Sequence, residues 1–161
     1  MIHDLAELGR VGRALSEVLD LLKSEQQRLE QQHGQDRYRD GTAGSPMQTL
    51  HGIGQLCSGV GDVLKHVVLA AGYISLGLDE RADNEVGLAR MKPVGVPSGA
   101  DRMVRPLGES TVRALEMLRD LDGFFHTELG LAIDVTLAAP QATYPPDDWA
   151  AYQRQQRDRP E

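Results

Sequence analysis

Residues 45–78 read SPMQTLHGIGQLCSGVGDVLKHVVLAAGYISLGL, and the only charged side chains among them are Asp62 and Lys65. Apolar residues return at alternating steps of three and four, which is the spacing of one face of an α-helix. A helix with so few charges must be covered on most of its sides, by other helices or by a second copy of the chain. The residues that keep this spacing are Leu50, Ile53, Cys57, Val60, Leu64, Val67, Ala71, Ile74 and Leu78.

The flanks of this stretch predict a helix over 45–77. Ser45 suits the N-cap, and Pro46 suits the first helical position because its missing N–H would be unpaired there in any case. Gln48 stands where its side chain can reach back to the cap. The helix is expected to run as far as Gly77.

Two further helices of about 30 residues each are predicted, one on each side of the first. One covers 4–33, with Asp4 as its cap and Gly34 just past its end. The other covers 108–139 and must end before Pro140, because proline cannot continue a helix. The predicted fold class is therefore all-α, an elongated antiparallel bundle of three long helices.

The segment 78–107 is expected to be a long loop between the second and third of these helices. Its three prolines interrupt any continuous helix across it. Within it, Asp79–Met91 can form one short helix, with an acidic cap and a little apolar surface.

A polar tail follows the bundle. The chain is therefore divided into a helical bundle domain, 1–139, and a C-terminal tail or short helix, 140–161. In the tail, Trp149 and Tyr152 are one helical turn apart. They can dock on the bundle or anchor another protein.

Composition limits the classes of function. The chain carries 17 basic and 24 acidic residues, a net charge of −7, and no basic cluster, which disfavours binding to nucleic acid. The uncharged apolar run 67–78 is shorter than the about 20 residues that span a bilayer, so no membrane helix is expected. The single cysteine, Cys57, cannot form an intrachain disulfide, and the first residues lack the pattern of a secretory signal. These features predict a cytoplasmic protein.

Four glycines inside the middle helix need a reason, because each costs about 0.5–1 kcal/mol relative to alanine. Gly52 and Gly59 are seven residues apart, as are Gly54 and Gly61, so each pair lies on one side of the helix. A neighbouring backbone can approach closely there. One alternative is a helix that starts near Ser58. Another is a phosphate-binding loop, for which the required lysine and hydroxyl residue are missing.

Association with a second copy of the chain is the main functional hypothesis. Two amphipathic helices can cover only part of the middle helix, so its remaining side is predicted to pack against the same helix of another chain. We expect a non-enzymatic scaffold, adaptor or regulator that forms a homodimer and needs no cofactor. Another protein would bind through the 78–107 loop or the tail. The predicted partner-binding residues are Gly52, Leu56, Gly59, Val63, Val68, Trp149 and Tyr152.

One motif in the last helix offers an enzymatic alternative. On a continuous helix, Arg119, Asp122 and His126 fall at i, i+3 and i+7 and share one face. A carboxylate beside a histidine suits general acid or base catalysis, and the arginine can hold a phosphate. The spacing resembles the arginine-to-histidine motif of HEPN-type ribonucleases, which implies a dimeric helical ribonuclease or toxin component. An exposed polar stripe on a solvated helix is the simpler explanation of the same residues.

Metal binding and export are the remaining options. The histidines His51, His66 and His126 stand singly, without a second ligand at helical spacing, so no metal site is expected. The first two helices resemble the helical hairpins exported by type VII secretion, and Tyr144–Asp148 loosely matches a tyrosine-to-acid export signal. The Trp-x-Gly turn of those hairpins does not occur in 34–44.

Overall fold

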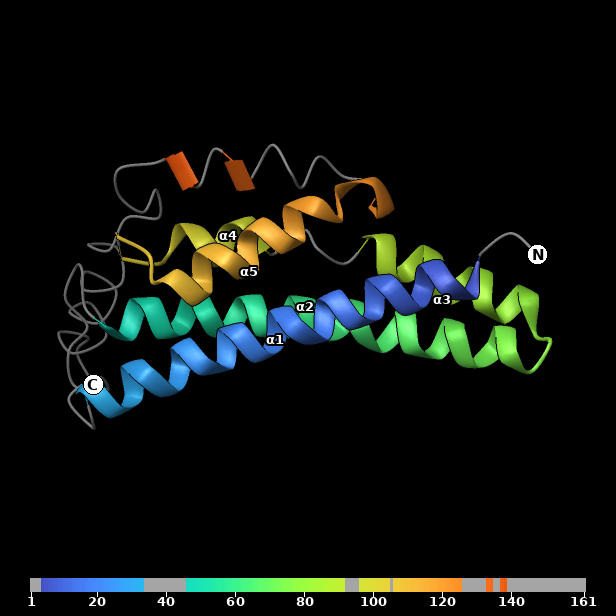
Figure 1. The fold of residues 1–161 in the computed structure, drawn as a ribbon, viewed down its shortest axis with the longest axis horizontal. Helices are drawn as coiled ribbons and strands as arrows, with labels where there is room; N and C mark the ends of the chain where they lie inside the picture. Colours follow the sequence, from blue (N-terminus) through green and yellow to red (C-terminus); the bar gives the residue numbers. More distant parts are fainter. Residues whose placement is uncertain are drawn as a thin grey trace, which may run out of the picture.

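A computed structural model describes residues 4–33, 46–91, 96–104, 106–125, 133–134 and 137–138, and the regular elements of this part of the chain are all helical. They pack against one another in an elongated bundle (Figure 1), so the predicted all-α class is confirmed. The elements are α1 (Leu5–His33), α2 (Pro46–Ser75), α3 (Asp79–Met91), α4 (Val96–Asp101), α5 (Glu109–Asp120) and the 3-10 turn η3 (Asp122–Phe124).

Helices α1 and α2 lie side by side as a long antiparallel hairpin (Figure 1). The Asp4 side chain accepts a hydrogen bond from the Ala6 N–H at 3.0 Å, which caps the start of α1 as the sequence predicts. At the end of α2, Gly77 has a φ of 76°, and the Leu78 N–H donates to the Tyr73 carbonyl at 2.8 Å. Glycine takes this left-handed conformation without steric cost, so it closes the helix and turns the chain into α3.

The segment 78–107 is not the long loop that its prolines suggest. It holds α3 and α4, and both pack along α2 (Figure 1). α3 covers the Asp79–Met91 stretch for which a short helix is predicted. α4 begins at Val96 with Pro97 in its first turn, where proline is tolerated because no helical hydrogen bond is lost. This proline therefore lies inside the start of a helix instead of interrupting one.

The order of contacts along α2 shows that α3 and α4 run antiparallel to it. His66, in the second half of α2, contacts Glu85 of α3 with Nδ1 and Oε2 2.5 Å apart. Gly52, near the start of α2, lies against Gly99 of α4. The two short helices together thus supply the third rod of the bundle.

The prediction of one continuous helix over 108–139 is wrong. α5 ends at Asp120, η3 follows, and Phe125 is extended, with φ −91° and ψ 151°. The break allows two consecutive rings, Phe124 and Phe125, to face the core together, with exposed fractions of 4% and 7%. Arg90 of α3 lies over the Phe124 ring at 5.2 Å from its centroid. Burial of both rings therefore accompanies the change of direction.

The core is built from one stripe on each long helix. On α2 the predicted residues Ile53, Val60, Val67 and Ile74 are buried, but Leu56, Val63 and Ala70 are buried in place of Cys57, Leu64 and Ala71. The reason is that α3 and α4 cover a side of the helix that was expected to stay open. Cys57 and Leu64 are only partly buried, at the edge of this core. The buried residues of α2 are Gly52, Ile53, Leu56, Val60, Val63, Val67, Ala70 and Ile74, and those of α1 are Leu8, Val11, Leu15, Val18, Leu22, Glu25 and Leu29.

Candidate interaction surface

The glycine pair Gly52 and Gly59 faces α4 of the same chain. A Cβ at Gly52 would overlap the Gly99 carbonyl oxygen and would lie 2.9 Å from Cγ of Met103. A Cβ at Gly59 would lie 3.6 Å from Cγ2 of Val96, an ordinary contact. The close backbone approach predicted for α2 therefore occurs at Gly52, but it is intramolecular.

The other glycine pair faces outward. In the described part of the chain, no heavy atom comes within 4 Å of a Cβ placed at Gly54, Gly61 or Gly72, beyond the immediate helix. Their spacing puts the three glycines on one side of α2. Val68 and Leu76 lie on the same side, with exposed fractions of 59% and 73%. We call this surface the outer face; it comprises Gly54, Ser58, Gly61, Asp62, Lys65, Val68, Leu69, Gly72, Ser75 and Leu76.

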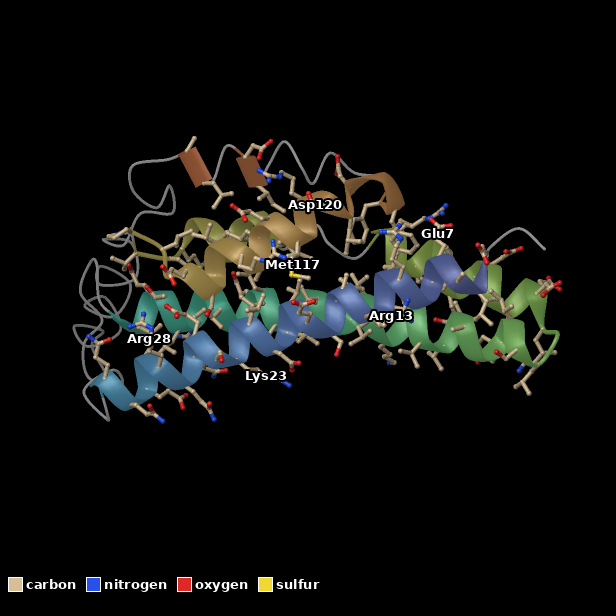
Figure 2. The ribbon with its side chains drawn as sticks, viewed as in Figure 1. Glu7, Arg13, Lys23, Arg28, Met117 and Asp120 are labelled. Atoms are coloured by element: carbon tan, nitrogen blue, oxygen red, sulfur yellow. The ribbon has the colours of Figure 1, made fainter. Side chains whose placement is uncertain are left out.

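The outer face has one acid and one base. Asp62 and Lys65 are one turn apart and exposed, and neither side chain forms a hydrogen bond or an ion pair within the described ranges. α1 differs, because its exposed side carries charged residues such as Glu7, Arg13 and Lys23 (Figure 2). α2 thus combines large exposed apolar side chains with little charge, which is the pattern of a surface that is covered by a partner.

The predicted partner-binding residues are divided by the structure. Val68 lies on the outer face, whereas Leu56 and Val63 have exposed fractions of 0% and 1% and belong to the core. Gly52 is likewise buried beneath α4, and Gly59 is partly buried beside Val96. The sequence predicts a long loop over 78–107 with one short helix in it and does not predict that the segment packs along α2, so this side of α2 was expected to be open for a partner. Trp149 and Tyr152 lie outside the described residues.

The predicted catalytic residues do not share one helix face. Arg119 is in the last turn of α5, Asp122 begins η3, and the helix has ended before the chain reaches His126, which lies outside the described residues. Arg119 Nη1 donates to Asp134 Oδ1 at 3.0 Å, and the two side chains are 40% and 54% exposed. The hydrogen bond to Asp134 raises the pKa of Arg119. Ribonuclease activity from these residues stays a prediction of the sequence alone.

A histidine–carboxylate pair that the sequence did not predict joins α2 to α3. His66 and Glu85 have side-chain exposed fractions of 14% and 19%, so the contact is partly shielded from water. An antiparallel hairpin about Gly77 brings them together, and recognising α3 as a packed helix would have predicted the pair. In the described ranges, no group of three or more His, Cys, Asp or Glu side chains could hold a metal ion. The His66–Glu85 contact connects α2 to α3.

A buried charge lies where α1 meets α5. Glu25 is 4% exposed and accepts two hydrogen bonds from Arg28, at 2.7 and 3.0 Å. Its carboxylate touches Gly108, the residue before α5, where a helix N-terminus favours negative charge. The pairing with Glu25 raises the pKa of Arg28. Farther along α5, Met117 lies on the side of the helix that faces α1 (Figure 2). Glu25 is thus a packing residue with its partners in place.

No protein-family model, curated protein or solved structure matches this chain. Among the described helices, none has both the length and the apolar content to cross a membrane. In the described part of the chain, the outer face of α2 is the surface best suited to bind a partner.

Proposed function

We propose that this chain is a non-enzymatic helical protein that works by self-association, as a homodimer formed through the outer face of α2. The exposure of Val68 and Leu76, 59% and 73%, carries this proposal. Each Å² of apolar surface that is removed from water contributes about 25 cal/mol of favourable free energy to association. A second copy offers the same low-charge surface, so both faces would be covered at once by an isologous contact.

The outward glycines support the same conclusion. Gly54, Gly61 and Gly72 weaken the helix, and packing within the described part of the chain does not require them, because their outward sides are open. Small residues allow two helix backbones to approach closely. A dimer contact would therefore explain residues that the folded monomer leaves unexplained. The proposed contact lies on the Gly54 and Gly61 side of α2.

The size of the face predicts a weak dimer. From Gly54 to Leu76 it extends over about 33 Å at 1.5 Å per residue. One helix face is smaller than a standard interface of about 800 Å² per partner, so we expect a dissociation constant in the micromolar range, roughly 10–100 µM. Self-association should therefore depend on concentration.

Sedimentation equilibrium of the full chain tests the proposal, over concentrations of about 1–500 µM that bracket the expected constant. The wild-type chain should pass from monomer to dimer, and Val68→Glu and Leu76→Glu should remain monomeric. Met91→Glu is the matched control, because Met91 is 67% exposed on α3 and lies outside the outer face. A wild-type chain that stays monomeric throughout, or a Met91→Glu chain that dissociates as fully as Val68→Glu, would overturn it.

A further inference from the structure

The two charges of the outer face restrict how two copies can meet. In a parallel pair each residue faces its own copy, which brings Asp62 near a second Asp62 and Lys65 near a second Lys65. In an antiparallel pair, residues equally far from the two-fold axis face each other. An axis at the level between Val63 and Leu64 places Asp62 opposite the partner's Lys65, twice over. The charges thus repel in one orientation and attract in the other.

We propose that two copies of the chain pair antiparallel through their outer faces, with reciprocal Asp62–Lys65 contacts about this axis; the inference rests on the proposed self-association. Neither side chain has a partner within the described part of its own chain. Both are therefore free to pair without breaking an existing contact. The occupant of the outer face is a second copy because the face carries its own complement.

The shape of the face agrees with the same register. Gly61 lies almost opposite the partner's Lys65, so the apolar stem of that lysine can lie across the open space at the glycine. Gly54 lies almost opposite the partner's Gly72, at each end of the contact. Two backbones can approach closely where both residues are glycine. Ser58 lies opposite the partner's Leu69, a small residue facing a large one.

A second antiparallel register has its axis at Gly61 and sets Gly61 against the partner's Gly61, with Gly54 at the level of the partner's Val68. It leaves Lys65 at the level of the partner's Ser58, with no acid opposite. Charge therefore distinguishes the two registers, and a charge-reversal experiment can separate them.

The first experiment reverses the charges in the full chain and measures the dimerisation constant by sedimentation. Asp62→Lys and Lys65→Asp should each weaken the homodimer about tenfold, because two attractive contacts become repulsive. The double variant should recover wild-type affinity, and an equimolar mixture of the single variants should form heterodimers. Asp20→Lys, an exposed reversal on α1, is the control and should leave the constant unchanged. Single reversals that behave like this control would overturn the inference.

The second experiment fixes orientation by disulfide formation on a Cys57→Ser background. Chains carrying Ser58→Cys and Leu69→Cys should cross-link when mixed under mild oxidation. Ser58→Cys alone should not, because the two copies of residue 58 are then about 16 Å apart along the axis, beyond the reach of a disulfide. Self-cross-linking of Ser58→Cys in a sample that dimerises would overturn the antiparallel register while leaving self-association intact. Absence of any dimer would overturn the proposed function itself.

Discussion

Alanine at Gly61 should stabilise the folded monomer, whereas alanine at Gly52 should destabilise it. Both changes remove the conformational cost of a helical glycine, a gain of about 0.5–1 kcal/mol. At Gly61 nothing opposes the gain, because no described atom lies within 4 Å of the added Cβ. At Gly52 the Cβ would overlap the Gly99 carbonyl, and Met103, 0% exposed, cannot swing into solvent. Overpacking of this kind costs about 1–3 kcal/mol, so the net effect is a loss.

Urea unfolding followed by circular dichroism, at a low micromolar concentration where the chain is monomeric, measures both effects. Gly54, Gly61 and Gly72 are about 10 Å or more apart along α2, so their gains should add to about 1.5–3 kcal/mol in the triple alanine variant. The same variant should dimerise less well than wild type, since the backbones are held apart. Stability and self-association would thus change in opposite directions. Gly52→Ala matching or exceeding wild-type stability, or Gly61→Ala losing as much as Gly52→Ala, would refute the assignment of inner and outer sides.

Two further predictions concern α2 and its neighbours. Glu85→Gln should lower the free energy of unfolding by about 1 kcal/mol, because a partly shielded charge-assisted hydrogen bond to His66 becomes a neutral one. Urea unfolding checks this against Glu17→Gln, an exposed change in the middle of α1, and equal stabilities would contradict it. Burial raises the pKa of the Cys57 thiol, partly offset by Lys23, so less thiolate is present near pH 8 than in a free thiol. Reaction with a disulfide reagent should therefore be slower than that of a free thiol and should accelerate as pH rises. Lys23→Ala should slow it further, and a rate equal to that of the free thiol would contradict the prediction.

The two long helices were predictable because their signals are local. Asp4 and Gly34 mark the two ends of a regular apolar stripe in the first helix. Ser45–Pro46 and Gly77 mark the two ends of the second. Which side of the second helix faces inward was not predictable. The spacing between Gly52 and Gly59 equals that between Gly54 and Gly61, and only the position of α4 distinguishes the two pairs.

α4 carried a signal that proline obscured. Val96, Ala100 and Met103 follow one another at steps of four and three, and all three are 0% exposed. Pro97 was expected to interrupt a helix, but it lies in the first turn of one, so this buried stripe was not predicted. Because the packing of α3 and α4 on α2 was not predicted, Leu56 and Val63 were assigned to a partner, although the chain covers them itself. The candidate surface on α2 therefore depended on tertiary packing that periodicity does not contain.

The end of α5 depended on packing as well. The apolar spacing through Leu118, Leu121 and Phe125 fits a helix, but Phe124 is also buried, and the chain changes direction where both rings turn inward. Catalytic geometry inferred from an unbroken helix, as for Arg119 and Asp122, was therefore not realised.

Glu25 determines how α5 can slide along α1. Its carboxylate fits where Gly108 leaves room and a helix begins, and Arg28 reaches it from the water side. A shift of α5 by one turn would move Gly108 and the start of the helix away from this buried carboxylate, at a cost in free energy. One buried acidic residue thus favours a single lengthwise alignment of α1 and α5, whereas leucine at the same position would tolerate several.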